Sequence, residues 1–189
     1  MAEVKKNPFT KGLSGAVGDY MVFRRVGKQT IVSTAPVHSG EVSEKQKDVR
    51  ERFQMATIYA KAAIEDPTLK EQYDAKATKS KYRSGYHVAV ADFFHAPEIE
   101  EIDIGEYTGA VGSKIRIRVF DDFKVQVVKV EIYNQDGSLV EQGQANNNTH
   151  PLDWFYTATV DNPQLAGDRI VIKAIDYPGN ISEQETTCN

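Results

Sequence analysis

The C-terminal half of the chain alternates between apolar and polar positions with a period of two. Strict alternation occurs at residues 114–119 and 128–132, and further strand-forming runs occupy residues 139–140, 154–160 and 169–174. Asp136-Gly137 separates two of these runs, and this dipeptide is typical of the tight turn in a β-hairpin. Because alternation places one face of each strand in a core and the other in water, the pattern predicts an antiparallel β domain.

The density of these runs predicts two packed sheets. About seven strands fit within residues 97–189, the number found in a constant-type immunoglobulin domain. We therefore expect this half to be an immunoglobulin-like antiparallel β-sandwich. A scaffold of this kind presents surfaces and does not by itself imply chemistry.

The N-terminal half begins with strand-forming residues. Residues 20–23 and 30–32 are the two runs, and residues 24–28 between them would form the turn of a β-hairpin. A hairpin of this size is not stable alone, so we expect it to pack on the helices that follow or on another subunit.

Three helices are expected after the hairpin. Ser43 and Gln46 match a capping box. An apolar stripe at helical spacing follows it, formed by Val49, Phe53, Ala56, Ala60 and Ala63. Pro67 begins a second helix over residues 68–77, and a third covers residues 82–94.

The predicted fold class is therefore α+β with two modules. Residues 1–96 form a β-hairpin and helical module, residues 97–189 form the β-sandwich, and an acidic run at residues 98–106 leads into the second module. Residues 1–96 hold 16 Lys and Arg against 11 Asp and Glu, whereas residues 97–189 hold 7 against 16. The basic module of one copy could contact the acidic module of the next, and two unrelated surfaces are the alternative.

Candidate catalytic groups are few. His87 and His95 are eight residues apart on the expected third helix, which separates them by about 12 Å, too far to share one zinc ion. Asp92 could contact His95 across a helical turn, as an ordinary polar pair. Cys188 is the single cysteine, and no serine lies in a Gly-x-Ser-x-Gly motif. We predict a protein that is not an enzyme and that has no catalytic residue, cofactor or metal.

Calcium binding stays open as an alternative. Sandwich domains can bind calcium through loop carboxylates at one end. The expected loops carry Asp121, Asp122, Asp176 and Asn180. These residues supply a partial set of the six or more oxygen ligands that calcium requires.

Two clusters of basic residues are candidate contacts for nucleic acid. Arg24, Arg25 and Lys28 lie on the hairpin, and a second cluster before the third helix contains Lys76, Lys79, Lys81 and Arg83. Phosphate neutralisation uses such residues. The acidic neighbours of the second cluster and the net charge of −4 argue against nucleic acid as a partner.

Five short motifs form a series along the C-terminal half. They are Lys129-Val130-Glu131-Ile132-Tyr133, Asp136-Gly137, Glu141-x-Gly143-x-Ala145, Trp154-x-Tyr156 and Ala174-x-Asp176-x-x-Gly179-Asn180. On these motifs the half resembles bacterial immunoglobulin-like domains, which often end with a comparable strand and turn. The resemblance implies adhesion, spacing or assembly rather than catalysis.

A second series of motifs lies in the N-terminal half. It consists of Gly12-x-x-Gly15-x-x-Gly18, Gly27-Lys28, Pro36 and Gln46-x-x-x-Arg50-x-x-Phe53-x-x-Ala56. On these residues the half is similar to a group of uncharacterised proteins from Bacteroidota. This similarity implies no known activity.

The sequence thus favours a structural protein that self-associates into a filament, a ring or a component of a phage- or tail-like particle. The expected assembly contacts are Met21, Val22, Phe23, Arg24 and Arg25. The alternative is a monomeric binding module that recognises a glycan or a protein through the sandwich loops, with Tyr177 as a stacking surface.

No apolar run reaches the roughly eighteen residues that span a membrane, and residues 1–8 lack the apolar core of a secretion signal. We therefore expect no membrane contact and a cytoplasmic protein, with a component of a released particle as the alternative.

Overall fold

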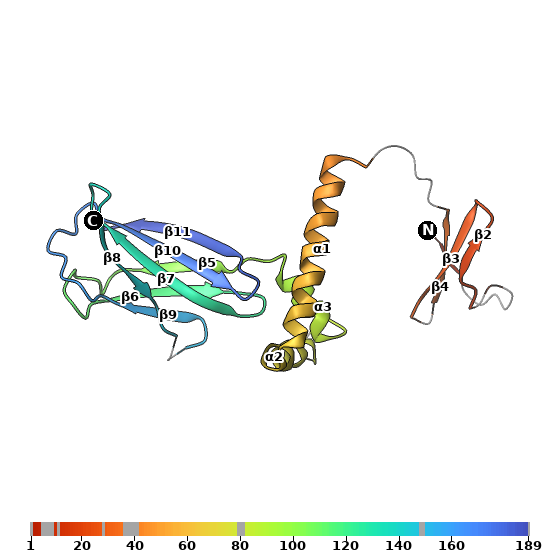
Figure 1. Cartoon of the computed structure of the whole chain (residues 1–189), viewed down its shortest axis with the longest axis horizontal. Helices are drawn as coiled ribbons and strands as arrows, with labels where there is room; N and C mark the ends of the chain where they lie inside the picture. Colours follow the sequence, from red (N-terminus) through yellow and green to blue (C-terminus); the bar gives the residue numbers. More distant parts are fainter. Residues whose placement is uncertain are drawn as a thin grey trace. The chain divides into compact units, whose positions relative to one another are not determined.

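The computed structural model describes residues 2–4, 10, 12–27, 29–35, 42–78, 82–147 and 150–188. Within these ranges the chain has eleven strands and three helices, so the predicted α+β class is confirmed (Figure 1). Four of the residues named above lie outside the described ranges: Lys28, Pro36, Lys79 and Lys81.

The chain divides into two compact units, Met1–Lys47 and Asp48–Asn189. The sequence pattern predicts a division after residue 96. In the structure, nearly all of the helical region is grouped with the C-terminal sheets and not with the N-terminal strands.

The first unit is one antiparallel sheet with the strand order β1-β4-β3-β2. Its strands are β1 (Ala2–Val4), β2 (Gly15–Val17), β3 (Met21–Val26) and β4 (Gln29–Thr34). The expected hairpin is β3 and β4, but its turn is shorter than residues 24–28. Arg24 and Arg25 pair with β4 inside the strand, because pairing continues to Val26 and Gln29. Gly27 follows directly and adopts the left-handed conformation, with φ of 61°.

The sheet of the first unit has almost no core of its own. Phe23 and Thr30 are the buried side chains among the residues of this unit whose burial is described. All three residues of the edge strand β2 are exposed. A small sheet is stable independently only when a hydrophobic face is packed against other strands or a helix, and the described residues of this unit bury one hydrophobic side chain, Phe23.

Three helices follow, α1 (Glu44–Glu65), α2 (Pro67–Thr78) and α3 (Gly85–Asp92). The predicted capping box at the start of α1 is confirmed. The Ser43 amide donates to Gln46 Oε1 at 3.1 Å, and the Gln46 amide donates to Ser43 Oγ at 3.3 Å. The helix α3 begins later than expected, at Gly85, whose amide donates to Asp74 Oδ1 at 3.0 Å.

The predicted apolar stripe of α1 is buried only in its C-terminal half. Ala56, Ala60 and Ala63 are buried, and the latter two pack with residues of α2 and α3, including Tyr73 and Val88. Val49 and Phe53 are 66% and 54% exposed. The correct helical period therefore did not by itself decide which part of the helix is covered.

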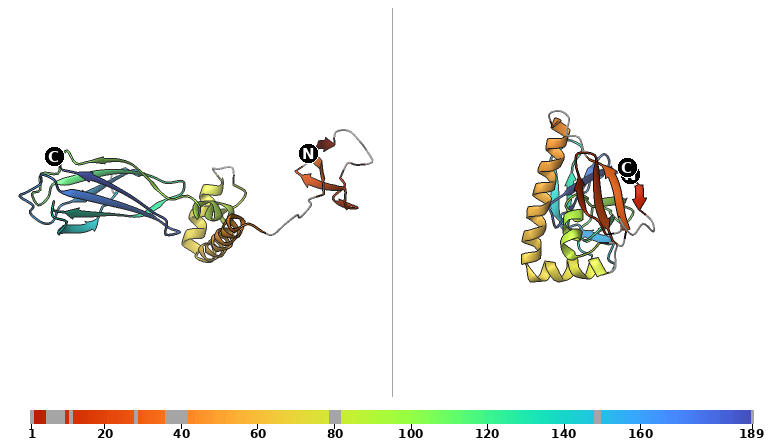
Figure 2. Two further views of the ribbon diagram at one scale, coloured as in Figure 1. Left: turned by 90° about the horizontal axis from the view of Figure 1, so that it is seen from above. Right: turned by 90° about the vertical axis from the view of Figure 1, so that its right-hand side faces the viewer.

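Seven strands form two antiparallel sheets in the C-terminal region (Figure 2). The first has the order β11-β10-β7-β8 and the second β5-β6-β9. The bounds are β5 (Glu98–Asp103), β6 (Lys114–Phe120), β7 (Val125–Tyr133), β8 (Leu139–Gln144), β9 (Asp153–Thr157), β10 (Arg169–Asp176) and β11 (Ile181–Thr187). The acidic run expected as a connection is thus largely strand β5.

One hydrophobic core joins these two sheets. Alternate residues of β6, β7, β9 and β10 contribute to it: Ile115, Ile117, Val119, Val128, Val130, Ile132, Trp154, Tyr156, Ile170, Ile172 and Ala174. Each of these side chains is at most 7% exposed. The period-two pattern of the sequence therefore identified the inward faces correctly.

Among the described residues, no helix is both long and apolar enough to cross a membrane.

Candidate functional site

Three carboxylates meet where α3 packs against one end of the C-terminal sheets. Asp92 is the last residue of α3, Asp121 follows β6, and Asp176 is the last residue of β10. One carboxylate oxygen from each lies within 4.8 Å of the others. We call this group the carboxylate junction, because it joins three segments that are distant in the sequence.

Asp176 holds the turn between β10 and β11. Its Oδ1 accepts hydrogen bonds from the amides of Gly179 at 2.8 Å and Asn180 at 2.6 Å, and its Oδ2 accepts from Asn180 Nδ2 at 2.7 Å. Gly179 has a φ of 92°, which a side chain would disfavour. The Asp-x-x-Gly-Asn motif is thus a turn in which the carboxylate replaces backbone acceptors.

Asn180 connects this turn to the end of α3. Its side-chain nitrogen also lies 3.3–3.4 Å from the backbone carbonyl oxygens of Asp92, Phe93 and His95. The last carbonyls of a helix lack partners within the helix, so an amide donor at this place stabilises its end. The same residue therefore fixes the turn and positions the helix that carries Asp92.

Asp92 is only 2% exposed and ends a chain of hydroxyl groups. Its Oδ2 accepts a hydrogen bond from the Tyr73 hydroxyl at 2.7 Å, and the Tyr73 and Tyr59 hydroxyls are also 2.7 Å apart. The Tyr73 ring stacks on Phe123 with centroids 4.0 Å apart. Asp121 Oδ2 accepts from the Phe123 amide at 3.2 Å. Oδ1 of Asp92 and Oδ1 of Asp121 are buried without a hydrogen-bond partner in the described structure.

Burial and mutual repulsion disfavour the charged forms of these groups. Burial raises the pKa of Asp92 to about 7, the Tyr73 hydrogen bond opposes this rise, and the charges of Asp121 and Asp176 add to it. Burial likewise raises the pKa of Asp121 and of Asp176. Two like charges 4–5 Å apart repel by roughly 3–4 kcal/mol at an effective dielectric constant of about 20.

Lys76 is a described cation near this group, because it lines the same cavity as Asp92. Among the residues that the structure describes, no Lys, Arg or His nitrogen forms an ion pair with any of these three carboxylates. Burial and the proximity of the three carboxylates therefore favour uptake of positive charge at the junction, either as a proton or as a bound cation.

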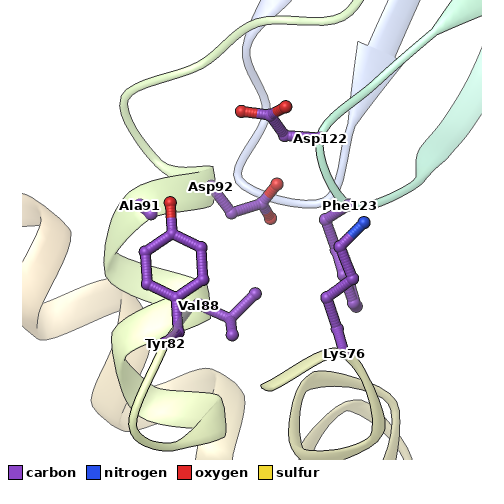
Figure 3. Close-up of a pocket in the computed structure, with 7 residues that line it drawn as sticks. All are labelled: Lys76, Tyr82, Val88, Ala91, Asp92, Asp122 and Phe123. Atoms are coloured by element: carbon purple, nitrogen blue, oxygen red, sulfur yellow. The ribbon is translucent and has the colours of Figure 1, made fainter. Parts of the chain in front are cut away.

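A cavity of about 320 Å³ lies beside Asp92 (Figure 3). Its lining comprises Lys76, Tyr82, Val88, Ala91, Asp92, Asp122 and Phe123. The Asp122 carboxylate points in a different direction from that of Asp92 in this view. Asp122 instead pairs with His95, with Oδ2 and Nδ1 3.0 Å apart. The expected contact of His95 is thus made with Asp122, and Asp92 faces the junction.

The structure brings together two of the four residues considered for calcium, Asp121 and Asp176. It adds Asp92, which sequence reasoning had not placed among the ligands, and separates Asp122 from the group. Asn180 acts through its amide nitrogen, as a donor to the turn and the helix.

The residues expected at assembly contacts lie together on β3. Phe23 is buried, Met21 is 43% exposed, Val22 is half-buried, and Arg24 and Arg25 are exposed. Tyr177, expected as a stacking surface, is half-buried beside the junction, and its ring meets Phe123 edge-on at 6.0 Å.

Comparison with known proteins identifies no family. No family model matches the chain, and no curated protein sequence matches it. CopC from Methylosinus trichosporium OB3b is 16% identical, with a TM-score of 0.35, over 48% of this chain and 88% of CopC. An engineered protein is 17% identical, with a TM-score of 0.32, over 55% of this chain and 26% of its own. Likenesses this weak carry no argument about fold or function.

Proposed function

We propose that this chain is a non-enzymatic structural protein that self-associates, and that its N-terminal sheet contacts other copies. The observation that carries the proposal is the single layer formed by β1 to β4. Its described residues bury one hydrophobic side chain, Phe23. Since such a sheet needs a covering surface, a contact with another subunit would supply the missing layer.

Exposed hydrophobic side chains support this reading. Nine of the fourteen large hydrophobic residues that are exposed in the described structure lie between residues 13 and 58. They are Leu13, Val17, Tyr20, Met21, Val26, Val49, Phe53, Met55 and Ile58. The first five belong to the first unit and the last four to α1. Several exposed apolar side chains within one small unit are typical of an interaction site, whereas scattered residues would carry no such meaning.

The charges of the two units favour a head-to-tail arrangement. Residues 1–47 hold 8 Lys and Arg against 4 Asp and Glu, and residues 48–189 hold 15 against 23. The basic unit of one copy would then contact the acidic unit of the next. Contacts between unlike surfaces close into rings or continue as filaments, and both forms occur in particles such as phage tails.

The C-terminal region fits the role of a rigid spacer. We infer that its sheets form an immunoglobulin-like sandwich, since three strands lie in one sheet, four in the other, and one core joins them. The free edge of β2 offers a further contact, because an unpaired strand can accept a strand from a neighbour.

The test is the mass of the full-length protein in solution. Size-exclusion chromatography with light scattering at tens of micromolar should give a multiple of 21.1 kDa. Negative-stain images of the same sample would show a ring or a filament. Replacement of both Arg24 and Arg25 by Glu should shift the protein towards the monomer, and added salt should act in the same direction.

A matched control reverses the same number of charges elsewhere. Lys61 and Lys70 are exposed on α1 and α2, and their double replacement by Glu should leave the mass unchanged. A wild-type protein that is monomeric under these conditions would contradict the proposal. It would favour the monomeric binding module that recognises a glycan or a protein through its loops.

A further inference from the structure

We propose that Asp92, Asp121 and Asp176 together bind one divalent cation of the calcium class, which ties α3 to one end of the C-terminal sheets. All three aspartates lie in the second unit, and their geometry does not depend on self-association.

The spacing of the oxygens suits a common ion. Calcium lies about 2.3–2.6 Å from its oxygen ligands, so two ligands of one ion are at most about 4.6–5.2 Å apart. One oxygen from each of the three aspartates lies within 4.8 Å of the other two. The three segments are therefore already close enough to share a single ion.

Unused oxygen atoms are available at this position. Tyr73 occupies Oδ2 of Asp92, and the Phe123 amide occupies Oδ2 of Asp121. The second oxygen of each carboxylate, Oδ1, is buried without a hydrogen-bond partner in the described structure. Asp176 accepts hydrogen bonds at both oxygens, but each oxygen retains capacity for a further contact.

The unpartnered oxygen of Asp92 is the second observation that points to a ligand. Asp92 is only 2% exposed, and its carboxylate extends from α3 towards the loop that carries Phe123 (Figure 3). Buried carboxylate oxygens are normally paired, so one that is left open beside two further carboxylates calls for a positive partner.

The donor set indicates the kind of ion. All three ligands are carboxylates, and hard oxygen donors select calcium, magnesium or manganese over zinc and copper, which prefer nitrogen and sulfur. The nearby histidine, His95, is engaged with Asp122. Calcium tolerates irregular coordination and takes six to eight oxygens, so water from the adjoining cavity of about 320 Å³ would complete its shell.

Calcium titration of the metal-free full-length protein tests the proposal. Isothermal calorimetry should show one ion per chain, and calcium should raise the melting temperature relative to EDTA. Terbium should compete for the same site and luminesce on tyrosine excitation, because the Tyr73 hydroxyl lies 2.7 Å from Asp92. Asp92→Asn and Asp121→Asn should each weaken calcium binding by about 10-fold or more.

Asp122→Asn is the matched control. Asp122 adjoins Asp121 in the sequence and lines the same cavity, but its carboxylate pairs with His95, so this variant should bind calcium like the wild type. Circular dichroism establishes that each variant is folded. If Asp92→Asn does not fold, the half-buried Asp121 provides the second site variant.

Two results would overturn the inference. The first is a wild-type protein that shows no saturable binding of calcium or terbium at one ion per chain. The second is unchanged affinity in folded Asp121→Asn, or an equal loss in Asp122→Asn. The latter would indicate diffuse attraction to acidic surface rather than a defined site.

Discussion

Replacing Tyr73 by Phe removes the central hydroxyl from the chain that ends at Asp92. Tyr73 is fully buried, and its hydroxyl lies 2.7 Å from both the Tyr59 hydroxyl and Asp92 Oδ2. The ring stack on Phe123 would persist, because Phe retains the ring. The substitution therefore tests the hydrogen bonds separately from the packing.

The expected loss of stability follows from the hydrogen-bond partners that Tyr73→Phe leaves unpaired. Above the Asp92 pKa of about 7, where this carboxylate is charged, a hydrogen bond to it contributes about 1.5–3 kcal/mol, and a buried acceptor left without its donor costs about 1–3 kcal/mol. Since these describe overlapping parts of one loss, we expect a destabilisation of about 2–3 kcal/mol. For a chain of this size that lowers the melting temperature by about 4–12 °C.

Urea unfolding, followed by circular dichroism, measures this change. Tyr133→Phe is the matched control, because it also removes a tyrosine-to-carboxylate hydrogen bond, that of Tyr133 to Glu131 at 2.9 Å. Glu131 keeps Lys173 as a partner at 2.9 Å, so the free energy of unfolding of the control variant should fall by less than about 1 kcal/mol. Equal losses in the two variants, or a loss below about 0.5 kcal/mol at Tyr73, would refute the reasoning.

Two further predictions concern the β domain. Gly109→Ala should destabilise the protein more than Gly112→Ala, by about 2 kcal/mol or more in urea unfolding. Both glycines have positive φ, but an added Cβ at Gly109 would lie 2.2 Å from a backbone oxygen, whereas nothing lies within 4 Å at Gly112. Equal losses of stability in the two variants would show that the positive φ alone sets the cost, and not the contact at Gly109. Lys173→Met should destabilise the protein at neutral pH and progressively less as pH falls below the ordinary Glu value of 4.5. The Lys173 hydrogen bond lowers the pKa of Glu131, and stability from a lowered pKa is lost on protonation. A destabilisation independent of pH would refute this assignment.

Strands with an uninterrupted period of two could be predicted from the sequence, and β5 could not. In β6, Ile115, Ile117 and Val119 alternate with polar residues, and all three are buried. In β5 the apolar residues that pack against the core are Ile99 and Ile102, three positions apart. The pairing with β6 shifts between Ile99 and Glu101, so an irregularity restores the inward direction of both isoleucines. The sequence alone shows only an acidic run there.

The carboxylate junction was predictable only in part, because its members come from different kinds of element. Asp121 and Asp176 follow clear strands, so their position near strand ends could be inferred. Asp92 lies at the end of a helix, and its approach to them depends on the Asn180 contacts with the carbonyls of α3. Those contacts join residues more than eighty positions apart, for which the local pattern contains no signal.

The same long-range contacts explain why the compact units divide near residue 47 and not after residue 96. The change from helical to strand period marks a change of secondary structure, whereas a compact unit is defined by shared contacts. Tyr73 of α2 stacks on Phe123, Lys124 donates to Gln72 Oε1 at 2.9 Å, and Asn180 holds the end of α3. Each contact crosses the predicted boundary. The helices are therefore part of the compact unit formed with the C-terminal sheets.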